Sequence, residues 1–279
     1  MGEERQVEAP GRVVHITSLV NPIVKEIRGL ALAKNRKESR LFVAEGLKLV
    51  ADAVDARWRL RYVVHAARVA NEALVERLSV VARARGATIV SVSEQVLGKI
   101  ARRENPQAVI GVFEQRLTRP TEIRPREADV WIALEAIRDP GNLGTIIRTA
   151  DAVGAAGVIL VGDTVDPFSV EAVRATMGSI FHIPLSRANH AEFDALRGRF
   201  ATVVGTHLAA TTDYREADYR GPVLLIMGGE QAGLTPAMAA ACGLLVKIPM
   251  AGKADSLNLA VATGVMLFEI MRDRLRIDG

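Results

Sequence analysis

Residues 247–269, KIPMAGKADSLNLAVATGVMLFE, are the segment around which the second half of this chain is organised. The segment leaves an apolar strand and passes through a polar loop. Apolar side chains then recur at helical spacing, which predicts a helix over residues 257–276. Ser256 and Asn258 stand at the strand-to-helix junction, where free backbone N–H groups gather and where open α/β sheets bind ligands. The simpler interpretation makes Ser256 only the N-cap of an amphipathic helix.

The sequence around this segment alternates short apolar runs with helical patterns. The apolar runs are nearly continuous, which is typical of strands buried on both faces of a parallel sheet. We therefore expect an α/β domain over residues 130–279. Its strands are predicted at 130–134, 157–161, 181–185, 201–206, 223–227 and 245–248, and its earlier helices at about 142–153, 170–177, 191–199 and 235–240. No Gly-x-Gly-x-x-Gly follows the first strand, which argues against a dinucleotide-binding site.

The preceding residues predict a smaller α/β unit and its connections. Residues 1–14 are expected to form a loose tail, and residues 15–114 alternate strands with helices over a normal domain length. Residues 115–129 contain Pro120 and Pro125, mixed charges and no apolar period, so we interpret them as an interdomain linker. The predicted organisation is a tail, a small α/β domain, a linker and a larger α/β domain.

Charge is distributed unevenly along the chain. Residues 1–129 hold 23 Lys/Arg against 16 Asp/Glu, whereas residues 130–279 hold 13 against 16, for a net charge of +4. This asymmetry suggests one module for a polyanion and another for chemistry, although an ordinary soluble surface is the alternative. Flexible cations on a loop neutralise phosphates without reading sequence. The phosphate contacts that we predict on this ground are the basic cluster of Lys34, Arg36, Lys37 and Arg40.

Cysteine usage and hydrophobic patterning limit the class of protein. The single cysteine, Cys242, excludes an internal disulfide and fits a reducing cytoplasm, which is where we expect the protein. No apolar run approaches the length of a membrane span, and the N-terminus lacks the apolar core of a secretory signal. The Cys and His residues show no metal-ligand spacing, so we expect no metal.

Two further motifs precede the 247–269 segment in the chain. Residues 139–148 have the sequence DPGNLGTIIR, and residues 227–234 have the sequence MGGEQAGL. Together with Ile248-Pro-Met and Ser256-Leu-Asn, they resemble the three ordered motifs of the SpoU/TrmH family of RNA ribose 2′-O-methyltransferases. That family belongs to the knotted SPOUT superfamily.

The motifs match the family pattern to different extents. Asn142, Gly144 and Arg148 supply the full Asn-x-Gly-x-x-x-Arg pattern of the first motif. The second motif has Gly229 where the family has Asn, and Gln231 where it has Gly. This departure keeps open a protein of another class, a non-catalytic RNA-binding factor that retains the fold.

The first domain resembles the substrate-binding domain attached to many SpoU-type enzymes, which is similar to certain ribosomal RNA-binding proteins. The matching features are residues 18–25, SLVNPIVK, the basic cluster, and residues 42–46, FVAEG. This resemblance implies ribosomal RNA as the substrate, with Lys34, Arg36, Lys37 and Arg40 as its contacts. Ribose methylation of tRNA is the alternative within enzymes.

The family resemblance implies transfer of a methyl group from S-adenosylmethionine to a ribose 2′-hydroxyl in RNA. It also implies a trefoil knot, with residues 256–277 threaded through a preceding loop, and a homodimer that completes the active site. The catalytic candidates that it assigns are Arg148, Asn142, Glu230, Ser256 and Asn258. The cofactor candidates are Gly228, Ile248 and Leu257, with Thr206 added because it ends a strand.

Arg148 has two competing interpretations. A guanidinium stays charged near neutral pH, so we expect it to bind phosphate and the developing alkoxide rather than to abstract a proton. Glu230 would orient Arg148 or Asn142. The alternative is an exposed ion pair between Arg148 and Asp151 or Asp139 on a solvated helix.

Overall fold

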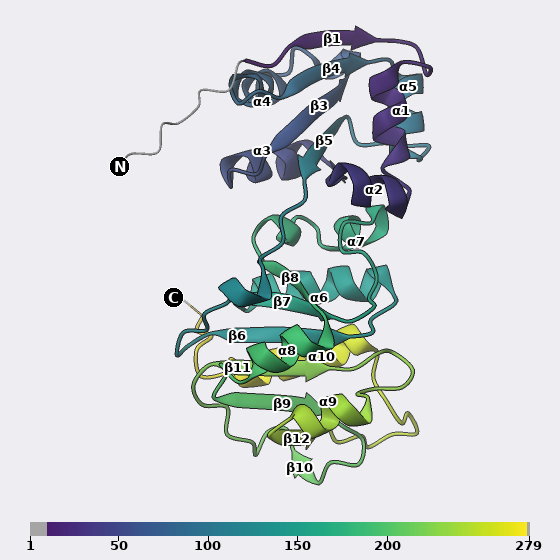
Figure 1. The fold of residues 1–279 in the computed structure, drawn as a ribbon. Coiled ribbons are helices and arrows are strands. Elements are labelled where there is room, and N and C mark those ends of the chain that lie inside the picture. Colours follow the sequence, from purple (N-terminus) through teal and green to yellow (C-terminus); the bar gives the residue numbers. More distant parts are fainter. Residues whose placement is uncertain (1–9, 278–279) are drawn as a thin grey trace, which may run out of the picture. The chain divides into compact units, whose positions relative to one another are not determined.

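The computed structural model describes residues 10–277, which form two compact units (Figure 1). Within these residues, unit 1 contains the chain up to Gln115 together with Phe168–Arg174. Unit 2 contains Arg116–Pro167 and the chain from Ala175 onward. No helix in this described part is long and apolar enough to cross a membrane.

Unit 1 is built on a five-stranded mixed sheet in the order β1-β4-β3-β5-β2. The pairs β1/β4 and β3/β4 are parallel, and β5 pairs antiparallel with both β2 and β3. The strands are β1 (Val13–Ile16), β2 (Leu41–Glu45), β3 (Leu60–Ala66), β4 (Thr88–Val92) and β5 (Val109–Glu114). The helices are α1 (Pro22–Gly29), α2 (Ala33–Ser39), α3 (Leu47–Asp55), α4 (Ala73–Ala84) and α5 (Glu94–Ala101), with a 3-10 turn η1 (Ala67–Val69).

The predicted tail over residues 1–14 extends too far along the chain. Val13 and Val14 belong to β1, where they pair in parallel register with Ile89 and Val90 of β4. The Ile89 amide donates to the Arg12 carbonyl (2.9 Å), which extends the ladder by one bond. Residues 1–9 lie outside the described part of the chain.

A short segment from the middle of the chain completes the core of unit 1. The Phe168 ring packs 4.9 Å from the Phe42 ring, and Phe42 also contacts the rings of Phe113 and Trp58. Arg174 of helix α7 (Val170–Ala175) donates to the Ala101 carbonyl (3.0 Å). The sequence pattern placed this segment in the second domain, because no local signal shows which core a single phenylalanine enters.

Unit 2 is built on a seven-stranded sheet in the order β10-β12-β9-β11-β6-β7-β8, and all of its strand pairs are parallel. The strands are β6 (Val130–Glu135), β7 (Gly157–Val161), β8 (Leu185–Ala188), β9 (Thr202–Thr206), β10 (Thr212–Asp213), β11 (Val223–Met227) and β12 (Leu244–Lys247). The helices are α6 (Pro140–Ala152), α8 (His190–Arg197), α9 (Pro236–Ala241) and α10 (Leu259–Ile270), with a 3-10 turn η3 (Ser179–Phe181). The predicted α/β class with a parallel sheet is confirmed.

The sheet of unit 2 is buried on both faces. One face carries Trp131, Ala133 and Ile226, which form a core cluster with Phe193 of α8 and Met238 of α9. The alternating residues are equally buried, as shown by Ile132, Leu134 and Leu225, each with no exposed surface. Two boundaries differ from prediction: residues 181–185 form the end of η3 and only the start of β8, and the last helix ends at Ile270.

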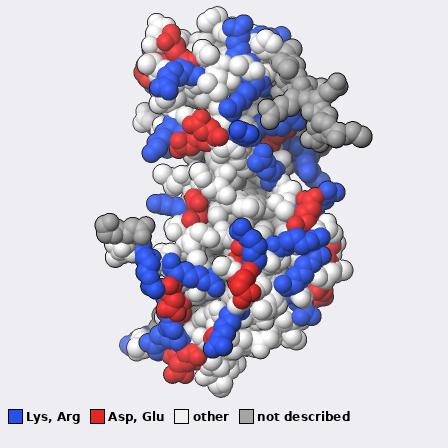
Figure 2. Space-filling model, turned by 90° about the vertical axis from the view of Figure 1, so that its left-hand side faces the viewer, with Lys and Arg blue, Asp and Glu red and all other residues white. Residues whose placement is uncertain are grey.

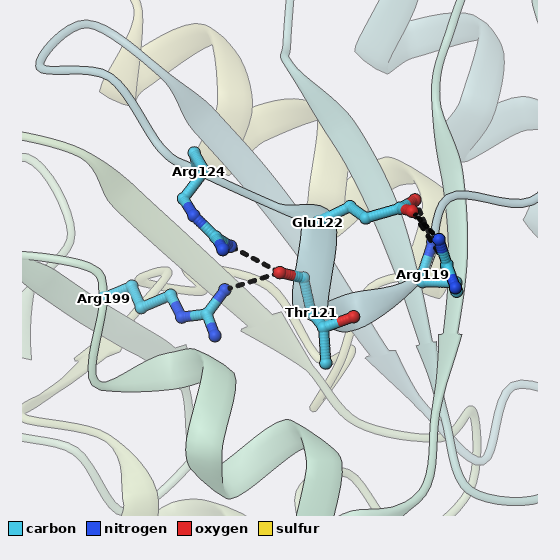
Figure 3. Close-up of polar contacts among 5 residues, drawn as sticks. All are labelled: Arg119, Thr121, Glu122, Arg124 and Arg199. Carbon is cyan, nitrogen blue, oxygen red and sulfur yellow. Dashed lines mark hydrogen bonds and ion pairs between the residues drawn. The ribbon is translucent and has the colours of Figure 1, made fainter.

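Of the predicted linker over residues 115–129, all but Gln115 belongs to unit 2. Ile123 is buried in the core cluster, and the 3-10 turn η2 (Pro120–Glu122) precedes it. Arg199 donates from Nη1 to the carbonyls of Ile123 (2.8 Å) and Thr121 (3.5 Å), and Arg124 donates to the same Thr121 carbonyl (Figure 3). A turn whose carbonyls receive two guanidiniums and whose exit residue is buried cannot act as a free linker.

Arg36 is buried, which corrects its predicted role as a flexible cation on a loop. It lies on helix α2, and its side chain donates from Nη1 to the carbonyls of Leu30 (2.8 Å) and Ala31 (2.9 Å) at the end of α1. A cation at this position satisfies carbonyls that a helix end leaves without intrahelical partners. Lys34, Lys37 and Arg40 are exposed, and their assignment to RNA stays a prediction.

Replacement of Arg36 should therefore destabilise the fold. We expect Arg36→Ala to lower the free energy of unfolding by about 1–3 kcal/mol, because it leaves buried carbonyls unsatisfied. The matched control is Lys37→Ala, an exposed change expected to stay within about 0.5 kcal/mol. Urea unfolding followed by circular dichroism measures both. Equal, small effects of the two changes would contradict the structural assignment of Arg36.

Candidate active site

The three motifs meet because the strands before them are neighbours. β12, β9, β11 and β6 lie side by side in the sheet and run in the same direction. The loops after β6, β11 and β12 carry the three motifs, and Thr206 ends β9 between them. Parallel strands place their carboxyl ends at one edge of a sheet, which is where α/β proteins bind ligands. The predicted catalytic and cofactor residues are thus brought to one edge of unit 2.

Side-chain hydrogen bonds connect all three motifs. The Glu230 carboxylate accepts from the backbone N–H groups of Asp139 (3.0 Å) and Arg138 (3.2 Å), and from Nδ2 of Asn142 (3.3 Å). Oδ1 of Asn142 in turn accepts from Nδ2 of Asn258 (2.9 Å). We call Glu230, Asn142 and Asn258 the motif network. Glu230 was expected to orient Arg148 or Asn142, and of these two its hydrogen bond is to Asn142.

Asn258 of the motif network and the neighbouring Asp139 mark where two helices begin. Oδ1 of Asn258 accepts from the backbone N–H groups of Ala260 (2.9 Å) and Val261 (3.3 Å), so Asn258 is the N-cap of α10. The simpler interpretation of Ser256 as this cap is wrong, because its hydroxyl contacts only Asp255 (3.4 Å) among the described residues. Asp139 is the N-cap of α6, because its Oδ1 accepts from the backbone N–H of Asn142 (2.6 Å).

Arg148 is exposed on α6, six residues after Asn142. Six residues advance a helix by about 9 Å. Within residues 10–277 its guanidinium makes no hydrogen bond or ion pair, so the alternative pairing with Asp151 or Asp139 is absent. The group is held in direction by the helix and remains available to an anionic ligand.

The loop after β11 is held closed from both sides. A Cβ on Gly228 would lie 1.9 Å from the carbonyl carbon of Gly233. The backbone at the start of the loop therefore lies too close to the backbone at Gly233 for residue 228 to carry a side chain. Gly229 pairs with Gly233 through a backbone bond (3.0 Å), and the position where the family has Asn thus serves the loop through its main chain. The departure at Gly229 leaves the motif network intact.

Glu135 supports the same loop, and sequence reasoning missed it. Its carboxylate, 3% exposed, accepts from the backbone N–H (3.1 Å) and the hydroxyl (2.9 Å) of Thr235. The available signal was an acid at the end of the otherwise apolar strand VWIALE. Burial of a carboxylate is costly unless it is hydrogen-bonded, which indicates that the geometry of this loop matters.

Three of the four cofactor candidates offer surface to a nucleoside ligand at this edge. Thr206 is half-buried at the end of β9, Ile248 and Leu257 flank the exposed loop after β12, and Gly228 is buried within the closed loop. Leu257 is 37% exposed and Ile248 half-buried, so both present apolar surface at this edge. Apolar walls with a few polar main-chain groups are usual for a purine site.

These features define an α/β RNA methyltransferase with a separate substrate-binding module, as comparison with known proteins shows. Residues 129–268 match the SpoU rRNA Methylase family, and residues 21–111 match the MRM3-like substrate binding domain. The chain therefore belongs to the SpoU rRNA methylase family. The membership predicted from the three motifs is confirmed, and with it the enzyme class.

Relatives of full length share both units. An uncharacterized tRNA/rRNA methyltransferase of Synechocystis is 33% identical over 270 residues, covering 94% of this chain and 95% of the relative. The 23S rRNA (guanosine(2553)-2′-O)-methyltransferase RlmP of Bacillus subtilis is 31% identical, covering 91% and 98%. The solved structure of an AdoMet-bound rRNA methyltransferase from Sinorhizobium meliloti is 53% identical with a TM-score of 0.90, covering 95% and 99%.

The motif network makes the stability of unit 2 depend on pH. Burial acts to raise the pKa of Glu230, but hydrogen bonds from Asp139, Asn142 and Arg138 outweigh it and hold the pKa below its ordinary value of 4.5. A lowered pKa in the folded state means that the stabilisation is present above the ordinary value. It is lost as the pH falls through the lowered one.

We expect Glu230→Gln to remove this dependence. The wild-type Tm should exceed that of the variant at pH 7 and converge with it as the pH falls below about 4.5. The control is Glu127→Gln, an exposed carboxylate of the same unit outside the motif network. Thermal unfolding from pH 3 to 7 measures the differences. A wild-type advantage that is constant over this range would contradict the ionic role of Glu230.

Proposed function

We propose that this protein transfers a methyl group from S-adenosylmethionine to a ribose 2′-hydroxyl of 23S ribosomal RNA, in the cytoplasm. Family membership, the AdoMet-bound structure at 53% identity and relatives named as 23S rRNA methyltransferases support the proposal. The observation that carries it is the intact motif network at the carboxyl edge of the sheet, together with an exposed Arg148 that has no partner in the described chain on the helix that begins there. Mapping ribose methylation in total RNA, with and without the gene, tests the substrate, and methylation confined to tRNA would overturn it.

The residues of the site divide the reaction between them. S-adenosylmethionine supplies an electrophilic methyl group when bound. Arg148 binds the phosphate and the 2′-oxygen of the target nucleotide and stabilises charge as it develops on that oxygen, because guanidiniums do not lose protons in proteins. Asn142 and Asn258 hold their loops in register through the motif network, and Ser256 lies exposed in the loop that would position the ribose.

The proposed enzyme is a homodimer that pairs through α10. Val261 and Phe268 are each 53% exposed on a helix that is apolar on all sides, and half-buried Val265 lies between them. Residues at these spacings share one helix face. α10 packs on α6, which carries Arg148, so a second subunit on this face would lie next to the site.

We also propose that residues 256–277 thread through a preceding loop and form a trefoil knot. β12 is separated from β6 by β9 and β11, yet α10 follows β12 and packs on α6, the helix after β6. The segment from β9 to β11 reaches outward to β10 beyond β12 and returns near the end of α10. Burial and, second to it, the nearby charge of Glu269 on α10 raise the pKa of Tyr219 in this segment. To reach α6 from β12, the chain has to pass the loops that follow β9 and β11. This path supports threading of the C-terminal segment through a preceding loop.

Removal of Arg148 should abolish most of the methyl transfer. We expect Arg148→Ala to reduce single-turnover transfer by roughly two orders of magnitude or more, as loss of a preorganised donor does. Arg148→Lys should restore little, because an ammonium cannot reproduce the forked contact. Calorimetry should show unchanged S-adenosylmethionine affinity in both variants. Near-normal transfer by Arg148→Ala would refute the catalytic assignment.

Introduction of charge on α10 should separate the subunits. We expect Phe268→Glu to give monomers at micromolar concentration in size-exclusion chromatography with light scattering, because it buries an unpaired carboxylate in the proposed interface. Val80→Glu on α4 is the matched control, since Val80 is also an exposed apolar helix residue (69%). A wild-type protein that is already monomeric would exclude the shared site.

A further inference from the structure

Helices α1 and α5 of unit 1 lie side by side (Figure 1). Residues of these two helices and of the segments after them line an open groove. The groove has a volume of about 840 Å³. Its lining is rich in basic side chains, with Lys25 and Arg28 from α1 and Lys99, Arg102 and Arg103 from the end of α5 and the residues after it. The predicted cluster on α2 contains none of these cations.

Four of these cations have no partner in the part of the chain that the structure describes. Lys25, Arg28, Lys99 and Arg102 make no side-chain hydrogen bond or ion pair with any residue between 10 and 277. Lys25 and Arg28 are three residues apart on α1, and this spacing places them on one side of that helix. Lys99 lies in the last turn of α5, and Arg102 follows its end. Arg102 adopts a left-handed backbone (φ 55°) at the end of α5.

The carboxylates near the groove do not cancel this charge. Glu94 lines it but forms an ion pair with Arg68 (2.9 Å), which lies outside the lining. Arg103 pairs with the buried Glu45 (3.5 Å) and is thereby held. Glu104 is the remaining acidic residue of the lining, against the four unpaired cations. The groove therefore holds a net positive charge in an open position.

The rest of the lining suits a sugar–phosphate chain. Gly29 and Gly98 carry no side chain, Ala31 is small, and Leu32 exposes 61% of its surface at the rim. Small residues among cations from two helices leave room for an extended polyanion, and an exposed leucine offers apolar contact to a ribose or base. The charges on other parts of the surface differ, because Lys and Arg are interleaved with Asp and Glu on the face shown in Figure 2.

We propose that the α1–α5 groove is the RNA-binding surface of unit 1, with Lys25, Arg28, Lys99 and Arg102 on the phosphates. The inference rests on the proposed function and names the contact surface for its substrate. The α2 cluster is a weaker candidate, because Arg36 is buried and Lys34 lies 3.9 Å from Glu38. Phosphate contacts of this kind position an RNA without reading its sequence.

The test neutralises the groove while preserving its backbone. The variant carries Lys25→Gln, Arg28→Gln, Lys99→Gln and Arg102→Asn, since Gln favours helices and Asn tolerates a left-handed conformation. Binding to a mixed-sequence single-stranded RNA is measured at several salt concentrations. We expect the slope of log affinity against log salt to become shallower by about 3, and affinity at 0.15 M salt to fall by at least about tenfold.

Two comparison variants separate the groove from general charge. The first neutralises Lys34, Lys37 and Arg40 on α2. The second removes four exposed cations elsewhere by changing Arg12, Arg77, Arg220 and Arg276 to Gln. Both should retain more affinity and a steeper slope than the groove variant. Equal losses in the groove variant and the four-cation control would overturn the proposal.

Methyl transfer to a 23S rRNA transcript distinguishes failure of the groove from failure of the function. A groove variant with raised KM, near-normal kcat and unchanged S-adenosylmethionine affinity supports the proposal. A wild-type protein that binds RNA through the groove but methylates none would refute the function alone. If the wild type methylates the transcript and the groove variant does so with an unchanged KM, the groove is not the RNA-binding surface. The same conclusion follows if the groove variant binds RNA normally but no longer binds ribosomal proteins.

Discussion

The parallel pairing of β12, β9, β11 and β6 is the constraint on which the site depends. Parallel strands must all end at one edge, so motifs separated by about a hundred residues become neighbours without any direct signal between them. The hydrogen bonds of Glu230 and Asn258 to Asn142 then lock three loops that the ladder has already placed together. The chemistry of the site follows from the register of the sheet.

The residues that link the motifs also cap the helices. Asn258 begins α10 with one end of its amide and holds Asn142 with the other, and Asp139 begins α6 beside the Glu230 carboxylate. A side chain that satisfies a helix terminus has its position fixed by the backbone. This arrangement leaves Arg148 as the catalytic candidate whose polar atoms are committed to nothing else in the described chain.

Most of the parallel α/β domain and the three motif loops could be predicted from sequence, because they depend on local periodicity and short spacings. The errors concern residues whose partners are distant in the chain. Arg36 is buried because α1 ends with carbonyls beside it, and Phe168 joins the core of unit 1 through Phe42, more than a hundred residues away. Ile123 is a single apolar residue among polar ones, so no period announces that it is buried.

Sequence likewise cannot show which Lys and Arg residues are free to bind an anion. Residues 1–129 hold 23 Lys and Arg, and their number alone cannot show which of them meet a phosphate. The structure sorts them by partner: Arg36 serves helix carbonyls, Arg103 serves a buried carboxylate, and Lys25 serves nothing within the described chain. A cation already paired must give up that partner before it can bind an anion, whereas an unpaired one loses only water and counterions. Unpaired charge therefore identifies a polyanion site more reliably than charge density.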